Sequence, residues 1–221
     1  MPICLVTSFA GLFNKHPDGL GIANPLVVGH DKHAGENIVI IGGATSLGQF
    51  SMFSSCPAYL FLNVWLCHTA IQCAQLSGFT VITTASVKHS DYLKSLGATH
   101  VIDRHLSTGI IADKITELLD GQPLKYSVDT VMNQETGQMA YDLLSPGGQH
   151  LVVNRDSIQK TENKKVCTVY GWASAEENYE NVKVLYSHLT SLLEEGTIKV
   201  SKTYTILAFD VSDSCSRSQT E

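Results

Sequence analysis

From residue 37 to residue 195, short apolar runs alternate with longer segments of helical periodicity. The apolar runs are rich in Val, Ile and Thr, as expected for buried strands. Between them, apolar residues recur every three or four positions, which is typical of amphipathic helices. We therefore predict strands over residues 37–41, 80–84, 100–103, 126–131, 149–153 and 166–172, and helices over residues 90–96, 109–119, 134–144 and 178–195.

This alternation predicts an α/β fold built from strand–helix–strand crossovers. Such crossovers join parallel strands and are almost always right-handed, so we expect a doubly wound parallel sheet. We place this domain at residues 35–207. Residues 208–221 contain almost nothing to bury, and we expect them to be a disordered tail.

The first strand leads into a run of small residues, Gly42-Gly-Ala-Thr-Ser-Leu-Gly48. In a dinucleotide-binding turn, one glycine permits the tight turn and a later one lets the next helix approach the strand; Gly43 and Gly48 stand at those places. Thr45 replaces the middle glycine, and the hydroxyls of Thr45 and Ser46 can donate to phosphate oxygens at a helix N-terminus. The motif alone is equally compatible with a structural turn, but the strand–helix pattern downstream favours cofactor binding.

The end of the second strand indicates which dinucleotide would bind. NAD sites usually carry Asp or Glu there to accept a hydrogen bond from the ribose 2′-hydroxyl. Here the chain reads Thr84-Ala-Ser-Val-Lys-His89, and Arg104 follows the third strand. The Ser86 hydroxyl and the Lys88 and Arg104 cations would attract a 2′-phosphate, which predicts NADP(H). The alternative is that Lys88 is a solvated residue at a helix start.

Composition narrows the function classes. A net charge of −6 argues against a nucleic-acid partner. Six scattered cysteines without a C-x-x-C motif give neither a zinc ribbon nor a disulfide framework, so we expect no metal and free thiols in a reducing, cytoplasmic setting. The most apolar window, residues 56–71, is shorter than the roughly 20 residues that span a bilayer, so we expect no membrane partner.

Four segments together resemble one known family: residues 35–50, 70–86, 91–103 and 144–148. They are similar to the zinc-free, quinone-reductase-like branch of the medium-chain dehydrogenase/reductase superfamily, and in particular to fungal trans-acting enoyl reductases. The resemblance implies a Rossmann-like domain, NADP(H), and hydride transfer to an activated C=C or carbonyl of a small-molecule substrate. It also implies that Gly43, Thr45, Ser46 and Leu47 line the pyrophosphate and nicotinamide, that Ser86 and Lys88 meet the 2′-phosphate, and that Val131 passes near the nicotinamide ribose.

The chain departs from this family at its N-terminus. The family carries a β-rich catalytic domain before the cofactor domain, whereas only residues 1–34 precede the first strand here. We interpret them as a remnant of the preceding linker and helix, so that the catalytic domain is largely missing and the catalytic residues are unknown. The expectation is a reductase of weak or no activity, with a non-catalytic dinucleotide-binding module or a decayed gene product as the alternative. Family members often form homodimers, and the same is an option here.

A second departure lies between Phe50 and Ala70. Without residues 51–69, Leu47, Phe50, Ala70, Ile71, Cys73 and Ala74 would fall on one helical stripe. With them, Ser54-Ser-Cys-Pro57 interrupts the helix that must follow the glycine turn. We interpret residues 51–69 as an aberrant insertion. The alternatives are a real surface loop, which would expose a large apolar patch, and a membrane-anchoring segment.

Overall fold

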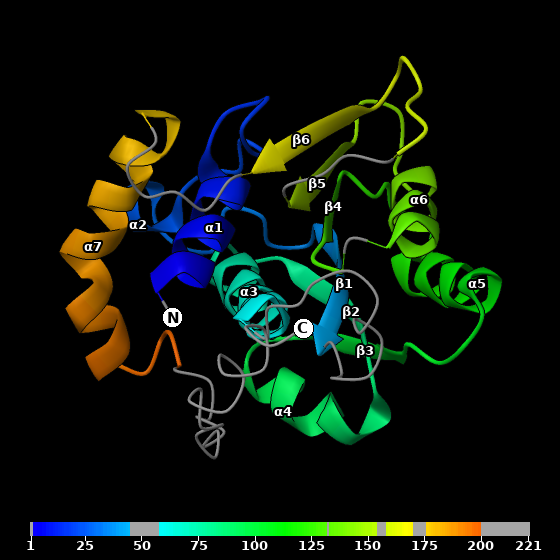
Figure 1. Cartoon of the computed structure of the whole chain (residues 1–221), viewed down its shortest axis with the longest axis horizontal. Coiled ribbons are helices and arrows are strands. Elements are labelled where there is room, and N and C mark those ends of the chain that lie inside the picture. The colour runs from blue at the N-terminus through cyan, green and yellow to red at the C-terminus, as the bar shows by residue number, and fades with distance from the viewer. Residues whose placement is uncertain (1, 45–57, 132, 154–157, 170–175, 200–221) are drawn as a thin grey trace, which may run out of the picture.

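The computed structural model describes residues 2–44, 58–131, 133–153, 158–169 and 176–199. Within them, six strands form one parallel sheet in the order β3-β2-β1-β4-β5-β6 (Figure 1). This order confirms the predicted doubly wound α/β fold, because the sheet grows in one direction from β1 to β3 and in the other from β4 to β6. The strands are β1 (Asn37–Ala44), β2 (Thr80–Ala85), β3 (His100–Asp103), β4 (Tyr126–Asp129), β5 (Gln149–Val153) and β6 (Lys165–Val169).

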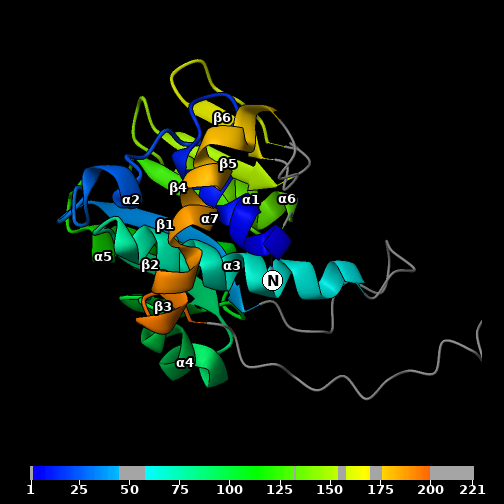
Figure 2. The same ribbon diagram turned by 90° about the vertical axis from the view of Figure 1, so that its left-hand side faces the viewer.

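Helices cover both faces of the sheet, on opposite sides of it in Figure 1 and Figure 2. Because successive side chains of a strand point to opposite faces, Ile38 and Ile40 join one core, and Val39 and Ile41 join the other. The first core includes side chains of α1 (Pro2–Phe13), α3 (Ala58–Leu76), α4 (Ser90–Ser95) and α7 (Tyr179–Glu194), and the second those of α5 (Thr108–Leu119) and α6 (Gln134–Asp142). The short helix α2 (Pro25–Val28) and the 3-10 turns η1 (Val87–His89) and η2 (Glu176–Asn178) complete the described elements.

The predicted elements are found close to their predicted places, with two corrections at strand ends. Strand β1 continues through the glycines to Ala44 rather than ending at Ile41. Strand β4 ends at Asp129 rather than Val131, because the Asp129 carboxylate binds the Val131 backbone N–H and turns the chain. The predicted sixth strand is described only to Val169, and the last part of residues 166–172 lies outside the described residues.

Residues 1–34 contribute to the core through α1. Residues 4–14 are all buried, and Phe9 and Phe13 pack edge to face with ring centroids 4.6 Å apart. A helix with every face buried has no amphipathic pattern, so its periodicity could not be read from the sequence.

Helix α3 includes the C-terminal part of the predicted insertion. The helix begins at Ala58, directly after Pro57, and continues to Leu76. The Ser8 hydroxyl donates to the Leu66 carbonyl oxygen (2.9 Å) and lies 2.6 Å from the Thr69 hydroxyl. Burial raises the pKa of the Cys67 thiol to about 12, and the hydrogen bonds of this thiol with the side chains of Thr130 and Thr83 offset only part of that rise. Residues 66–69 are therefore packed into this fold; residues 51–57 lie outside the described residues, as does the predicted tail.

In the described part of the chain, Cys4, Cys67, Cys73 and Cys167 are buried thiols. Among the described helices, none is both long enough and apolar enough to cross a bilayer.

Two isoleucines of α5 test the packing of the second core. Ile115 is fully buried, whereas Ile110, in the same helix, is 46% exposed. We expect Ile115→Ala to lower the free energy of unfolding by about 2–5 kcal/mol, because it leaves a cavity. Ile110→Ala should change it by less than about 1 kcal/mol. Chemical denaturation of both variants measures the difference, and equal losses would show that α5 does not pack as described.

Candidate functional site

The sheet changes its direction of growth between β1 and β4. In doubly wound sheets, ligands bind in a crevice outside the carboxyl ends of the strands at this point. Here threonine side chains hydrogen-bond the end of β1 to its neighbours β2 and β4. The Thr130 hydroxyl and backbone N–H both donate to the carbonyl oxygen of Ile41, at 2.8 and 3.3 Å. On the other side of β1, the Gly42 N–H donates to the buried Thr84 hydroxyl (3.1 Å), and Gly42 has a φ of 96°. The strand ends that flank the crevice are therefore fixed before the glycine turn begins.

Asp129 shapes the chain that leaves β4. It is 3% exposed, and its Oδ1 accepts a hydrogen bond from the Val131 N–H (2.8 Å). The Asp129 side chain thus caps the backbone that follows β4. Val131, predicted to pass near the cofactor, lies half-buried against the second core, two residues beyond the end of β4.

The structure brings two of the predicted phosphate-binding residues into contact. Arg104 follows β3 and donates through Nε to the Ser86 hydroxyl at the end of β2 (2.9 Å). The Arg104 backbone N–H donates to the Ala85 carbonyl oxygen (3.0 Å), which fixes the loop after β3 against β2. Lys88 is exposed in the adjacent turn η1, where its ammonium is free to meet a ligand or water. The fold thus brings together Ser86 and Arg104, which are 18 positions apart in the sequence.

Two histidines that the sequence analysis did not assign to the site belong to this cluster. The His105 ring nitrogen Nε2 lies 3.5 Å from the Ser86 hydroxyl. The pKa of His89 is lowered, first by burial and then by the positive charges of Lys88 and Arg104. The sequence signal was their position shortly after β2 and β3, but only the pairing of these strands places the His105 ring beside Ser86.

Most of the predicted glycine turn cannot be compared with the structure. Gly43 lies in β1, whereas Thr45, Ser46, Leu47 and Gly48 lie outside the described residues. Their assignment to a pyrophosphate site stays a prediction.

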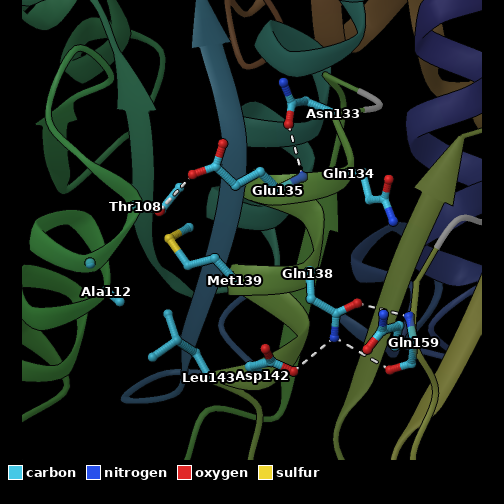
Figure 3. A pocket seen from close by; sticks show the side chains of 11 residues that line it. Thr108, Ala112, Asn133, Gln134, Glu135, Gln138, Met139, Asp142, Leu143 and Gln159 are labelled. Atoms are coloured by element: carbon cyan, nitrogen blue, oxygen red, sulfur yellow. Dashed lines mark hydrogen bonds between the residues drawn. The ribbon is translucent and has the colours of Figure 1, made fainter.

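A groove of about 940 Å³ lies between α5 and α6 (Figure 3). At its upper end in the figure, the Thr108 hydroxyl donates to Glu135 Oε1 (2.9 Å), and Asn133 Oδ1 caps α6 by accepting from the Glu135 N–H. Among the residues that the structure describes, the groove is lined by Glu135 and Asp142 but by no Lys, Arg or His. Its carboxylates would repel phosphates, so the cationic cluster at Ser86 is the better anion site.

No three His, Cys, Asp or Glu side chains of the described residues are grouped so that they could hold a metal ion. The described residues therefore do not fit a zinc site.

Comparison with known proteins identifies the relatives of this fold. A family model described as "Zinc-binding dehydrogenase" matches residues 66–190. The dehydrogenase azaJ of Aspergillus niger is 37% identical over 204 residues, covering 89% of this chain and 51% of that protein. The trans-enoyl reductase TOXD of Cochliobolus carbonum is 28% identical over 160 residues, covering 72% of this chain and 46% of that protein.

A solved structure agrees with the fold. The crystal structure of CurK enoyl reductase superposes with a TM-score of 0.64 at 18% identity, over 91% of this chain and 52% of that one. The chain therefore spans about half the length of the relatives that it matches.

Two helical glycines test how closely α6 must approach Asp129. A Cβ added to Gly137 in α6 would lie 2.8 Å from Asp129 Oδ2, whereas one added to Gly109 in α5 would meet nothing within 4 Å. We expect Gly137→Ala to lower the free energy of unfolding by about 1–3 kcal/mol, because Asp129 is held by Val131 and cannot move freely. Gly109→Ala should leave it unchanged or raise it by up to about 1 kcal/mol. Thermal or urea unfolding of the pair decides, and a stable Gly137→Ala variant would contradict the close approach.

Proposed function

This chain belongs to the zinc-binding dehydrogenase family, within the medium-chain dehydrogenase/reductase superfamily of oxidoreductases, and we propose that it binds NADP(H) to reduce a small molecule. The proposed substrate carries an activated C=C or carbonyl. The observation that carries the proposal is the contact between Ser86 and Arg104, with Lys88 beside it, at the carboxyl edge of a doubly wound sheet.

The topology supports dinucleotide binding. In open sheets of this kind, ligands bind outside the carboxyl ends of the strands, where the strand order reverses. Here the reversal lies between β1 and β4, and β1 leads from there into the predicted glycine turn. The hydrogen bonds of Thr84 and Thr130 hold both strand ends in place without a ligand. A preformed crevice reduces the ordering that binding requires.

The charges support NADP(H) over NAD(H). Ser86 stands at the end of β2, where a carboxylate would accept from a ribose hydroxyl and repel a phosphate. Arg104 is held against Ser86 through Nε, which leaves its other N–H groups for an anion. The carboxylate of Asp103, the last residue of β3, accepts a hydrogen bond from the His105 backbone N–H through Oδ1 (3.1 Å). The residues therefore fit a 2′-phosphate: two cations and a hydroxyl from two adjacent strand ends.

When bound, NADPH would supply the hydride for reduction. The residues of this chain would bind and orient it: Ser86, Lys88 and Arg104 would hold the 2′-phosphate, and the backbone from Gly42 to Gly48 would hold the pyrophosphate. The trans-enoyl reductase among the relatives suggests an α,β-unsaturated thioester as the first substrate to assay.

Removing the Arg104 charge tests the proposed site. We expect Arg104→Gln to weaken NADPH binding about tenfold or more, because a charge-assisted hydrogen bond to a phosphate contributes roughly 1.5–3 kcal/mol. NADH binding should change less than about twofold, because NADH has no 2′-phosphate. Calorimetric titration with both dinucleotides measures the two dissociation constants.

The matched control is Lys114→Gln, which removes the same charge from an exposed position of α5. It should leave both dissociation constants within about twofold of the unmodified chain, since exposed charges away from the ligand are screened. An equal loss of NADPH affinity in both variants would show that the loss comes from the change in net charge and not from a contact with Arg104. Equal losses of NADPH and NADH affinity in Arg104→Gln would contradict 2′-phosphate recognition.

A further inference from the structure

His89 is the last residue of the turn η1 that follows Ser86, and His105 directly follows Arg104. Turn η1 places His89 next to Ser86, because the His89 backbone N–H donates to the Ser86 carbonyl oxygen (2.9 Å). The loop after β3 brings the His105 ring to within 3.5 Å of the Ser86 hydroxyl. One hydroxyl is therefore bordered by the permanent cation of Arg104 and by the imidazole of His105.

The charges around the two histidines are mostly positive. Lys88 and Arg104 act on His89, and His89 in turn acts on His68 of α3, whose pKa burial lowers to about 4. Asp91 in the first turn of α4 and Asp103 at the end of β3 are the neighbouring carboxylates. Protonating His89 without a ligand would therefore oppose two fixed cations, and a bound dianion would remove this penalty.

We propose that His89 and His105 are specificity-determining residues of the 2′-phosphate site, and that they tighten NADPH binding as the pH falls from about 8.5 to about 6. The inference rests on the proposed function, since it assumes that the phosphate binds at Ser86. Neither residue takes part in the hydride transfer. Their effect is on the affinity for NADPH and on the preference for NADPH over NADH.

The contact between His105 and Ser86 supplies a mechanism. When Nε2 of His105 carries no proton, it accepts a hydrogen bond from the Ser86 hydroxyl. The hydroxyl hydrogen is then not available to a ligand. Protonation turns Nε2 into a donor. The Ser86 hydroxyl is then released to donate to the phosphate while still accepting from Arg104, and the imidazolium offers a second donor.

The direction of the pH dependence follows from linkage. A bound phosphate raises the pKa of a histidine that it contacts, so the added affinity is present at low pH and fades as the pH rises through the pKa of the complex. For His89 the effect begins at lower pH than for an ordinary imidazole, because its pKa in the free chain is lowered, chiefly by burial. The phosphate has a second pKa of about 6 and loses charge below it. Comparing variants at the same pH removes this contribution.

The test measures NADPH and NADH dissociation constants from pH 8.5 to pH 6 for the full chain and for the double variant His89→Gln, His105→Gln. We expect the ratio of variant to unmodified dissociation constants for NADPH to be about 1 at pH 8.5. The ratio should rise to about three- to tenfold at pH 6, because each exposed ion pair changes the affinity by up to about fivefold. For NADH the ratio should stay near 1 throughout. For the control His188→Gln, at an exposed position of α7, the ratio should stay near 1 for both dinucleotides.

A ratio that does not change with pH, while NADPH still binds tightly, overturns this inference and leaves the proposed function standing. A rise of the same size with NADH also overturns it, because NADH has no 2′-phosphate. If the unmodified chain binds neither dinucleotide at any pH, the proposed function fails and this inference fails with it. A measurement on the unmodified chain does not depend on variants that fold: NADPH should move the NMR titration midpoints of two imidazoles to higher pH, and NADH should not.

Discussion

The central position of β1 is the constraint on which the rest of the structure depends. Its backbone is hydrogen-bonded to β2 on one side and β4 on the other, and Ile38 to Ile41 are at most 2% exposed. Because β2 and β4 lie on opposite sides of β1, the sheet changes its direction of growth between β1 and β4, where sheets of this kind bind ligands. The hydroxyls of Thr84 and Thr130 satisfy backbone groups on the two sides of β1, so the strand ends at this point are held by hydrogen bonds.

The second feature of the site is a local reversal of charge. The chain carries a net charge of −6, yet Lys88 and Arg104 both lie at one corner of the sheet near His89, and the His105 ring lies against Ser86 there. The short parallel strands β2 and β3 bring this corner together, because their pairing places Ala85 opposite Asp103 and so sets Ser86 beside Arg104. A cationic corner on an acidic protein steers a phosphorylated ligand to one place and repels it elsewhere.

The sequence allowed the sheet to be predicted because buried strands are apolar runs bounded by glycine and polar residues. The end of β4 could not be predicted, since the turn at Val131 depends on a hydrogen bond that the Val131 N–H donates to the Asp129 side chain. Helix α1 had no readable period, since it is buried on every side. Arg104 was predicted from its type and place, whereas the role of His105 required knowing that its ring reaches Ser86. The helix that includes residues 66–69 shows the same limit: Ser8 lies 58 positions from Leu66, and only the fold brings them together.

The central claim is that NADPH binds at the carboxyl edge of the sheet with its 2′-phosphate at Ser86, and hydrogen–deuterium exchange of the full chain tests it most directly. We expect NADPH to slow amide exchange in residues 84–89, 103–107 and 130–131, while residues 33–37 and 122–126 at the opposite edge stay unchanged. NADH at equal occupancy should protect residues 130–131 but protect 86–89 and 104–105 much less. Protection confined to the opposite edge, or equal protection of residues 86–89 by both dinucleotides, would contradict the account.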